Sequence, residues 1–142
     1  MTVTVTTLDK EVEMCAQIIN PEGLVKPRGY SHGTVAEGRF VFVAGQVGVD
    51  AKGRPVGDDF ESQFDRSLAG VVEVVRAAGG RPENIVKMSI FVKDIDQFRS
   101  AKIGPVYASH LGKHFPAMTA LEVSGFMDDR YLVEIEAMAQ VG

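Results

Sequence analysis

The clearest pattern in the chain is the alternation of residue types in its last quarter, residues 115–139. From 131 to 138 the odd positions are apolar or aromatic, while the even positions include Glu134 and Glu136, and residues 118–123 alternate in the same way. A period of two indicates strands, so the stretch predicts a hairpin of two strands joined by turn-forming residues. The face with the two glutamates is either an ordinary solvated surface, the usual place for charge, or part of a site.

The rest of the chain shows both strand and helix periods. The predicted strands cover residues 15–20, 39–45 and 84–92, and the predicted helices cover residues 60–78 and 94–111. Proline in a helix interior is costly, so we expect the second helix to break at Gly104-Pro105 or to begin its main part there. Residues 2–7 favour an extended arm. This order of elements predicts an α+β protein whose two helices cover one face of a mixed sheet.

Composition adds limits to this picture. A length of 142 residues suggests a single domain over 1–142, with residues 1–14 as a loosely ordered arm. The net charge of −4 argues against a nucleic-acid surface. Cys15 is the single cysteine, so neither an internal disulfide nor a cysteine-based metal site is available, which favours a reducing compartment. No apolar run is long enough to span a membrane, and we expect a cytoplasmic protein without a membrane partner.

Few residues offer chemistry by their spacing alone. His110 and His114 are four residues apart, but Gly112 between them indicates that the helix is ending, so a metal pair is the less favoured interpretation. Ser31 and His32 are neighbours whose side chains point apart, which does not make a nucleophile and base. Gly45 ends a strand, where a glycine lets a ligand or another backbone come close. We predict no metal and no cofactor.

A set of short motifs in a particular order resembles the Rid (reactive intermediate deaminase) family, also called YjgF. The motifs are Tyr30-Ser31-His32, Ala44-Gly45-Gln46, Ile85-Val86-Lys87, Phe91-Val92-Lys93-Asp94, Phe98, Tyr107, Phe115-Pro116-Ala117 and Val133-Glu134-Ile135-Glu136-Ala137. The resemblance runs from about residue 23 to residue 139. It implies a chorismate-mutase-like α+β fold, a homotrimer with its sheets inside a barrel, and ligand clefts at the subunit interfaces. In the best-studied part of the family these clefts hydrolyse enamines and imines, such as 2-aminoacrylate, to a keto acid and ammonia.

Carried over residue by residue, the resemblance implies that Glu134 positions or activates water and that Tyr30 and Gly45 contact the ligand. Phe91 belongs to a shared motif and is a candidate for substrate contact. Two other positions of the cleft depart from the pattern.

The departures are Met118, which stands where deaminating members carry an arginine that grips a carboxylate, and Ala44, which replaces a frequent serine. Both changes make the cleft more apolar, because a thioether cannot replace a bidentate cation. The chain therefore resembles a divergent, arginine-lacking subgroup. Arg28, in the loop beside Tyr30, is a candidate substitute for the missing arginine.

Three functions follow as hypotheses. The first is hydrolysis of an imine or enamine whose head group depends less on a carboxylate. The second is a ligand-binding trimer without catalysis, and the third, a ribonuclease, is disfavoured by the net charge. We also expect the sheet faces of Val43, Val133 and Ile135 to need more cover than two helices give, which predicts a homotrimer.

Overall fold

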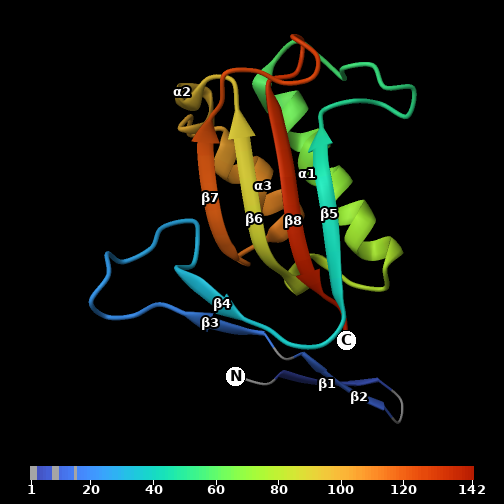
Figure 1. Cartoon of the computed structure of the whole chain (residues 1–142), viewed down its shortest axis with the longest axis vertical. Helices are drawn as coiled ribbons and strands as arrows, with labels where there is room; N and C mark the ends of the chain where they lie inside the picture. The colour runs from blue at the N-terminus through green and yellow to red at the C-terminus, as the bar shows by residue number, and fades with distance from the viewer. Residues whose placement is uncertain (1–2, 8–9, 15) are drawn as a thin grey trace.

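The chain forms a mixed sheet backed by helices, with two small strand pairs at one end (Figure 1). The structure is a computed structural model that describes residues 3–7, 10–14 and 16–142, with side chains from residue 16 onward. The strands are β1 (Val3–Thr7), β2 (Lys10–Met14), β3 (Gln17–Ile19), β4 (Gly33–Val35), β5 (Phe40–Val47), β6 (Ile85–Val92), β7 (Ala117–Glu122) and β8 (Val133–Gln140). The helices are α1 (Phe60–Ala77), α2 (Ile95–Phe98) and α3 (Ile103–Leu111), and a 3-10 turn, η1 (Pro82–Asn84), precedes β6.

The main sheet has the strand order β5-β8-β6-β7, in which β8 is antiparallel to both neighbours and β7 is parallel to β6. The predicted hairpin of β7 and β8 is therefore wrong, because β6 lies between them. A parallel pair needs a crossover, and α2 and α3 provide it between β6 and β7. The long connection at 123–132 then carries the chain past the end of β6 to the centre of the sheet.

Helix α1 forms where its apolar residues recur at helical spacing. Asp59 caps it, since its carboxylate accepts a hydrogen bond from the Ser62 backbone N–H at 2.8 Å, and this bond lowers the pKa of Asp59. Phe64 and Leu68 on its inner face are fully buried. Helix and sheet together build a single apolar layer, which α3 extends toward β7.

The second predicted helix is divided, as expected. Helix α2 ends at Phe98, and α3 begins at Ile103, so Pro105 falls in the first turn of α3, where a missing N–H costs little. Gly112 follows the last helical residue with a φ of 59°, a left-handed conformation that ends the helix before His114.

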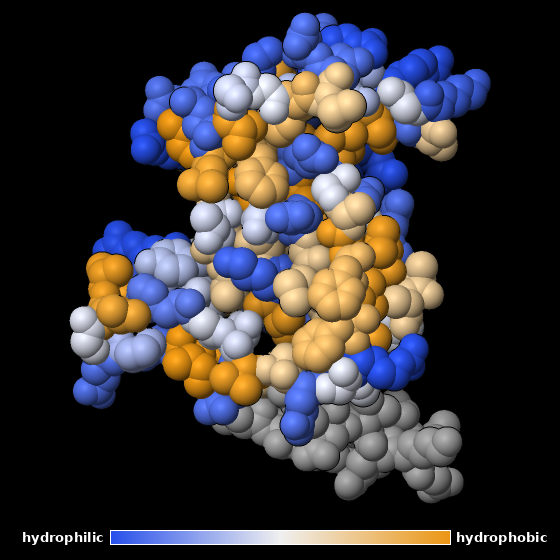
Figure 2. All heavy atoms as spheres, in the orientation of Figure 1, coloured by the Kyte–Doolittle hydropathy of each residue, from blue (hydrophilic) through white to orange (hydrophobic). Residues whose placement is uncertain are grey.

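The two faces of the sheet differ, and the view in Figure 1 looks onto the face that has no helix in front of it. Val43, Val133 and Ile135 lie on the other face and are buried beneath the helices. The prediction that these three need further cover is therefore wrong. The need arises instead on the open face, where Phe42 is 73% exposed and Met138 is 37% exposed. Figure 2 shows apolar side chains gathered over this face among polar ones.

The N-terminal part forms two further antiparallel pairs, β1 with β2 and β3 with β4. The predicted strand at 15–20 is confirmed as β3, although Cys15 lies outside the described residues. The predicted strands at 39–45 and 84–92 are confirmed as β5 and β6. Across the described residues, none of the helices is long and apolar enough to cross a membrane.

Candidate functional site

Glu134 is the second residue of β8 and points to the open face, since its neighbours Val133 and Ile135 point into the core. Phe91 of β6 and Val47 of β5 stand directly opposite it on the two flanking strands. The Glu134 side chain is half-buried, and within the described part of the chain no hydrogen bond or ion pair holds its carboxylate. A carboxylate in this setting is available to a ligand or a water molecule.

Gly45 lies against that carboxylate. A β-carbon built on residue 45 would overlap the Glu134 side chain, so only glycine allows this approach. The register of β5 on β8 shifts between Val43 and Gln46, which places Ala44 and Gly45 opposite a single residue. Such a bulge leaves backbone groups outside the ladder, and bulges are frequent beside active sites. The structure thus brings Glu134, Gly45 and Phe91 together, with Ala44 exposed beside them.

Tyr30 belongs to a loop that is attached to the start of β7. The Ser31 backbone N–H donates to the Pro116 carbonyl at 3.0 Å, and the Ser31 hydroxyl donates to the Phe115 carbonyl at 2.6 Å. Tyr30 is half-buried and meets the His32 ring edge-on, with 5.3 Å between the ring centroids. Arg28 in the same loop is exposed.

Met118 points to the opposite face from Glu134. It pairs in register with Met88, a fully buried core residue, and it packs against the core beneath the helices. There it lines a cavity of about 340 Å³ between α1, α3 and β7, which Gly29 also borders. The structure therefore separates the predicted residues into two groups: Glu134 with Gly45, Phe91 and Ala44 on the open face, and Met118 with the Tyr30 loop at the β7 edge.

The cavity beside Met118 was not predicted from the sequence. Phe64 lies in the predicted helix at 60–78, and Tyr107 is one of the family motifs. Nothing in helical spacing distinguishes a wall from a filled interior. The sequence signal for this cavity is the spacing of small residues by four, with Gly104 and Ala108 in α3 and Gly112 directly after its end.

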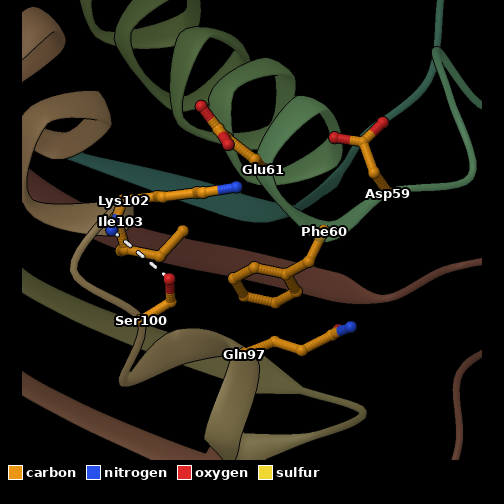
Figure 3. A pocket seen from close by; sticks show the side chains of 7 residues that line it. All are labelled: Asp59, Phe60, Glu61, Gln97, Ser100, Lys102 and Ile103. Carbon is orange, nitrogen blue, oxygen red and sulfur yellow. Dashed lines mark hydrogen bonds between the residues drawn. The ribbon is translucent and has the colours of Figure 1, made fainter.

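A second hollow of about 280 Å³ lies between the N-terminal ends of α1 and α3 (Figure 3). Asp59, Glu61 and Lys102 mix both signs of charge at its rim. Asp59 is already used as the cap of α1, and the Ser100 hydroxyl accepts from the Lys102 backbone N–H at 3.3 Å. Ile103 lines both hollows, so the two are neighbours.

The histidines have separate partners. The imidazole of His110 contacts the Asp65 carboxylate with 2.7 Å between Nε2 and Oδ1, while Nε2 of His114 contacts the Ile85 carbonyl at 2.7 Å. In the ranges that the structure describes, no three side chains of His, Cys, Asp or Glu are arranged to hold a metal ion.

Comparison with known proteins identifies the family. The family model described as endoribonuclease L-PSP matches residues 24–141, and the chain belongs to that family. A RutC family protein of Pyrococcus horikoshii is 36% identical over 87% of this chain and 96% of its own length. A 2-iminobutanoate/2-iminopropanoate deaminase of Salmonella typhimurium is 37% identical over 72% of this chain and 80% of its own.

Among solved structures, a Rid family protein from Yersinia pestis, of unknown function, superimposes with a TM-score of 0.79. The two are 32% identical, and the match covers 89% of this chain and 99% of the other. The resemblance to the Rid family and the α+β fold with a mixed sheet are thus confirmed. Membership of an arginine-lacking subgroup stays a prediction that rests on Met118.

Proposed function

We propose that this protein hydrolyses an imine or enamine of a reactive metabolite, giving a carbonyl compound and ammonia. The observation that carries the proposal is the half-buried carboxylate of Glu134, which has no partner among the described residues and lies against the backbone of Gly45. The Salmonella typhimurium relative, which is named an iminobutanoate and iminopropanoate deaminase, supports this reaction class.

The reaction needs water, a base and an acid. Glu134 accepts a proton from water as the water oxygen attacks the imine carbon, and it returns this proton to the nitrogen, which gives a carbinolamine. The hydroxyl proton of the carbinolamine then passes through the same carboxylate to the amine nitrogen, so the C–N bond breaks and ammonia leaves as the carbonyl forms. The backbone at Gly45, outside the ladder, offers polar groups to the substrate, and Phe91 supplies an apolar wall. An enamine enters the same sequence after it is protonated on carbon.

A second copy of the chain completes the cleft in this proposal. Glu134 and Met118 lie on opposite faces of one sheet, so a single chain cannot present both to one small molecule. The open face carries exposed Phe42 and Met138, which association would cover. We infer a homotrimer whose clefts combine Glu134 of one subunit with the Tyr30 loop of the next.

The proposed substrate has little dependence on a carboxylate. Met118 offers a polarizable apolar surface instead of a charged fork, and Ala44 adds no hydroxyl. Arg28 is exposed in the Tyr30 loop and is the candidate cation if a carboxylate is bound after all.

The test is ammonia release from imines generated in situ by an amine oxidase or an amino-acid oxidase. Glu134→Gln keeps the shape of the side chain but cannot accept the proton, so turnover should fall by about 10²-fold or more. Glu136→Gln, on the same face two residues further along β8, is the matched control and should retain turnover. Equal rates in both variants would remove Glu134 from the mechanism.

A trimer that binds a ligand without turning it over is the second candidate. One observation favours this second function. In the described part of one chain, no other titratable group is hydrogen-bonded to Glu134. Ligand-induced stabilisation without ammonia release would identify this function. A nuclease activity finds no support in a chain with a net charge of −4.

A further inference from the structure

The cavity beside Met118 has aromatic walls. Phe64 of α1 lies 6.1 Å from Phe98, and Tyr107 of α3 is stacked on Phe115 at 5.6 Å with only 7° between the ring planes, all distances being between centroids. Phe64 and Tyr107 are themselves buried, so the ring surface left to an occupant belongs to Phe98 and Phe115, which are half-buried. Another ring can pack against such a surface in an offset or edge-on arrangement. The aromatic lining of the cavity therefore favours a planar apolar occupant.

The cavity offers no charge to a ligand. Among its described lining residues none is acidic or basic. Among these residues the hydroxyl belongs to Tyr107, and it donates to the His114 carbonyl at 2.7 Å. Burial raises the pKa of Tyr107, so the phenol stays protonated and its proton remains in that hydrogen bond. An ionised group placed here would lose its water without gaining a partner, which is strongly unfavourable.

The cavity also has room and an entrance. A volume of about 340 Å³ exceeds the roughly 150 Å³ of an engineered apolar cavity that binds benzene. Gly29, Gly104 and Gly112 line it, and a β-carbon added at each of them would meet no other atom within 4 Å. This side of the cavity is therefore open, so that a small molecule can enter without moving the core.

We propose that this cavity binds a neutral aromatic group of one or two rings. The link to a reaction rests on the function proposed above: Met118 and the Tyr30 loop join the cavity to the cleft, and the ring is the substituent of the imine that is hydrolysed. The binding site itself stands on its walls, volume and lack of charge, so it can be tested without turnover.

Titration calorimetry with indole, compared with indole-3-carboxylate, tests the proposal on the full-length protein. Indole should bind with a dissociation constant below about 1 mM, and the carboxylate should bind at least about tenfold more weakly, because its charge finds no partner. The ¹³C-methyl spectrum of the methionines locates the site. Ring currents from indole should shift the Met118 signal and leave that of Met127, which is 99% exposed, unchanged.

Two tryptophan variants on α3 sharpen the test. Ala108→Trp adds a large ring to a lining residue and should abolish indole binding. Ser109, the next residue, is also exposed but does not line the cavity, so Ser109→Trp should leave indole binding unchanged. Both changes are on exposed positions, so both variants should fold.

The outcomes separate this inference from the proposed function. Indole binding at Met118 without imine turnover upholds the site and overturns the hydrolase. Turnover without indole binding, or with equal binding of the carboxylate, overturns the site. If the cavity is instead filled by a side chain of a second copy, indole will not bind and Ala108→Trp will change the oligomeric mass, which also overturns it.

Discussion

Gln63 should be one of the most sensitive positions in the molecule. Its side chain is fully buried on α1 and makes three hydrogen bonds. The amide nitrogen donates to the carbonyls of Gly57 at 2.9 Å and Arg130 at 3.0 Å, and the amide oxygen accepts from the Leu132 N–H at 2.8 Å. A β-carbon on Gly48 would overlap the Gln63 backbone, so the end of β5 is packed against the same residue.

Replacing Gln63 by leucine keeps the volume and removes all three bonds. Each is worth about 0.5–1.5 kcal/mol net, and a buried group left without a partner costs about 1–3 kcal/mol. Because Arg130 is on an exposed loop, its carbonyl recovers water, and we expect a loss of about 2–4 kcal/mol in the free energy of unfolding. That is a large share of a typical 5–15 kcal/mol, and it should lower the melting temperature by roughly 10 °C.

Denaturant unfolding followed by circular dichroism measures this loss. Gln97→Leu is the control, because Gln97 is exposed and its change should stay within about 0.5 kcal/mol. Gln63→Glu should cost more than leucine at neutral pH, since a carboxylate would face two carbonyl oxygens, and part of the loss should return on acidification, when the acid can donate one bond.

The titration of Asp128, which holds the loop through Arg130, does not affect how the stability of Gln63→Glu depends on pH in the range measured. A hydrogen bond from Arg130 lowers the pKa of Asp128 to about 2, so the stability that this carboxylate contributes is present above its ordinary pKa of 3.8 and is lost only as the pH falls toward 2. Measurements between pH 5 and pH 8 are outside that range. If Gln63→Leu were no less stable than Gln97→Leu, the three bonds would contribute nothing and the reasoning would be wrong.

Three further predictions concern the proposed cleft and its assembly. The protein should hydrolyse 2-aminoacrylate slowly, because losing a bidentate pair of charged hydrogen bonds weakens binding by about two orders of magnitude. Met118→Arg should gain part of this activity. If the unmodified protein reached rates typical of arginine-bearing members, this reasoning would be refuted and Arg28 would be the next residue to test. Gly45→Ala should displace the Glu134 carboxylate and reduce turnover by about tenfold or more while the oligomer persists, and an unchanged rate would show that the close approach is not needed. Light scattering should give three times the mass of the 15.4 kDa chain, whereas monomer alone at micromolar concentration would contradict the trimer.

The sequence predicted the strongly periodic elements well. Helix α1 and strands β5 and β6 carry unbroken apolar patterns bounded by Gly and Asp, so their type and approximate limits follow from local spacing alone. The pairing of β7 with β8 was wrong because alternation fixes the faces of a strand and says nothing of its neighbour. The crossover through α3 decides that neighbour, and it acts over a distance that no local pattern records.

The structure brings some of the predicted site residues together, while their roles stay predictions. Resemblance to a family singled out Glu134, Gly45 and Phe91, and the structure places these three side by side. The resemblance could not show that Met118 faces the helices, because the face on which Met118 lies depends on the register of β7 against β6. The aromatic cavity could not be predicted for a related reason. Residues that line a cavity and residues that fill a core have the same spacing along the sequence.

The two-sided arrangement of the sheet has a genetic consequence. If each cleft joins Glu134 of one subunit to the Tyr30 loop of the next, a chain altered at Glu134 and a chain altered at Tyr30 are defective in different halves of the cleft. Coexpression of the two would assemble mixed rings in which about a quarter of the clefts receive both intact halves. Two inactive alleles would then restore activity to each other, while two alleles altered in the same half would not.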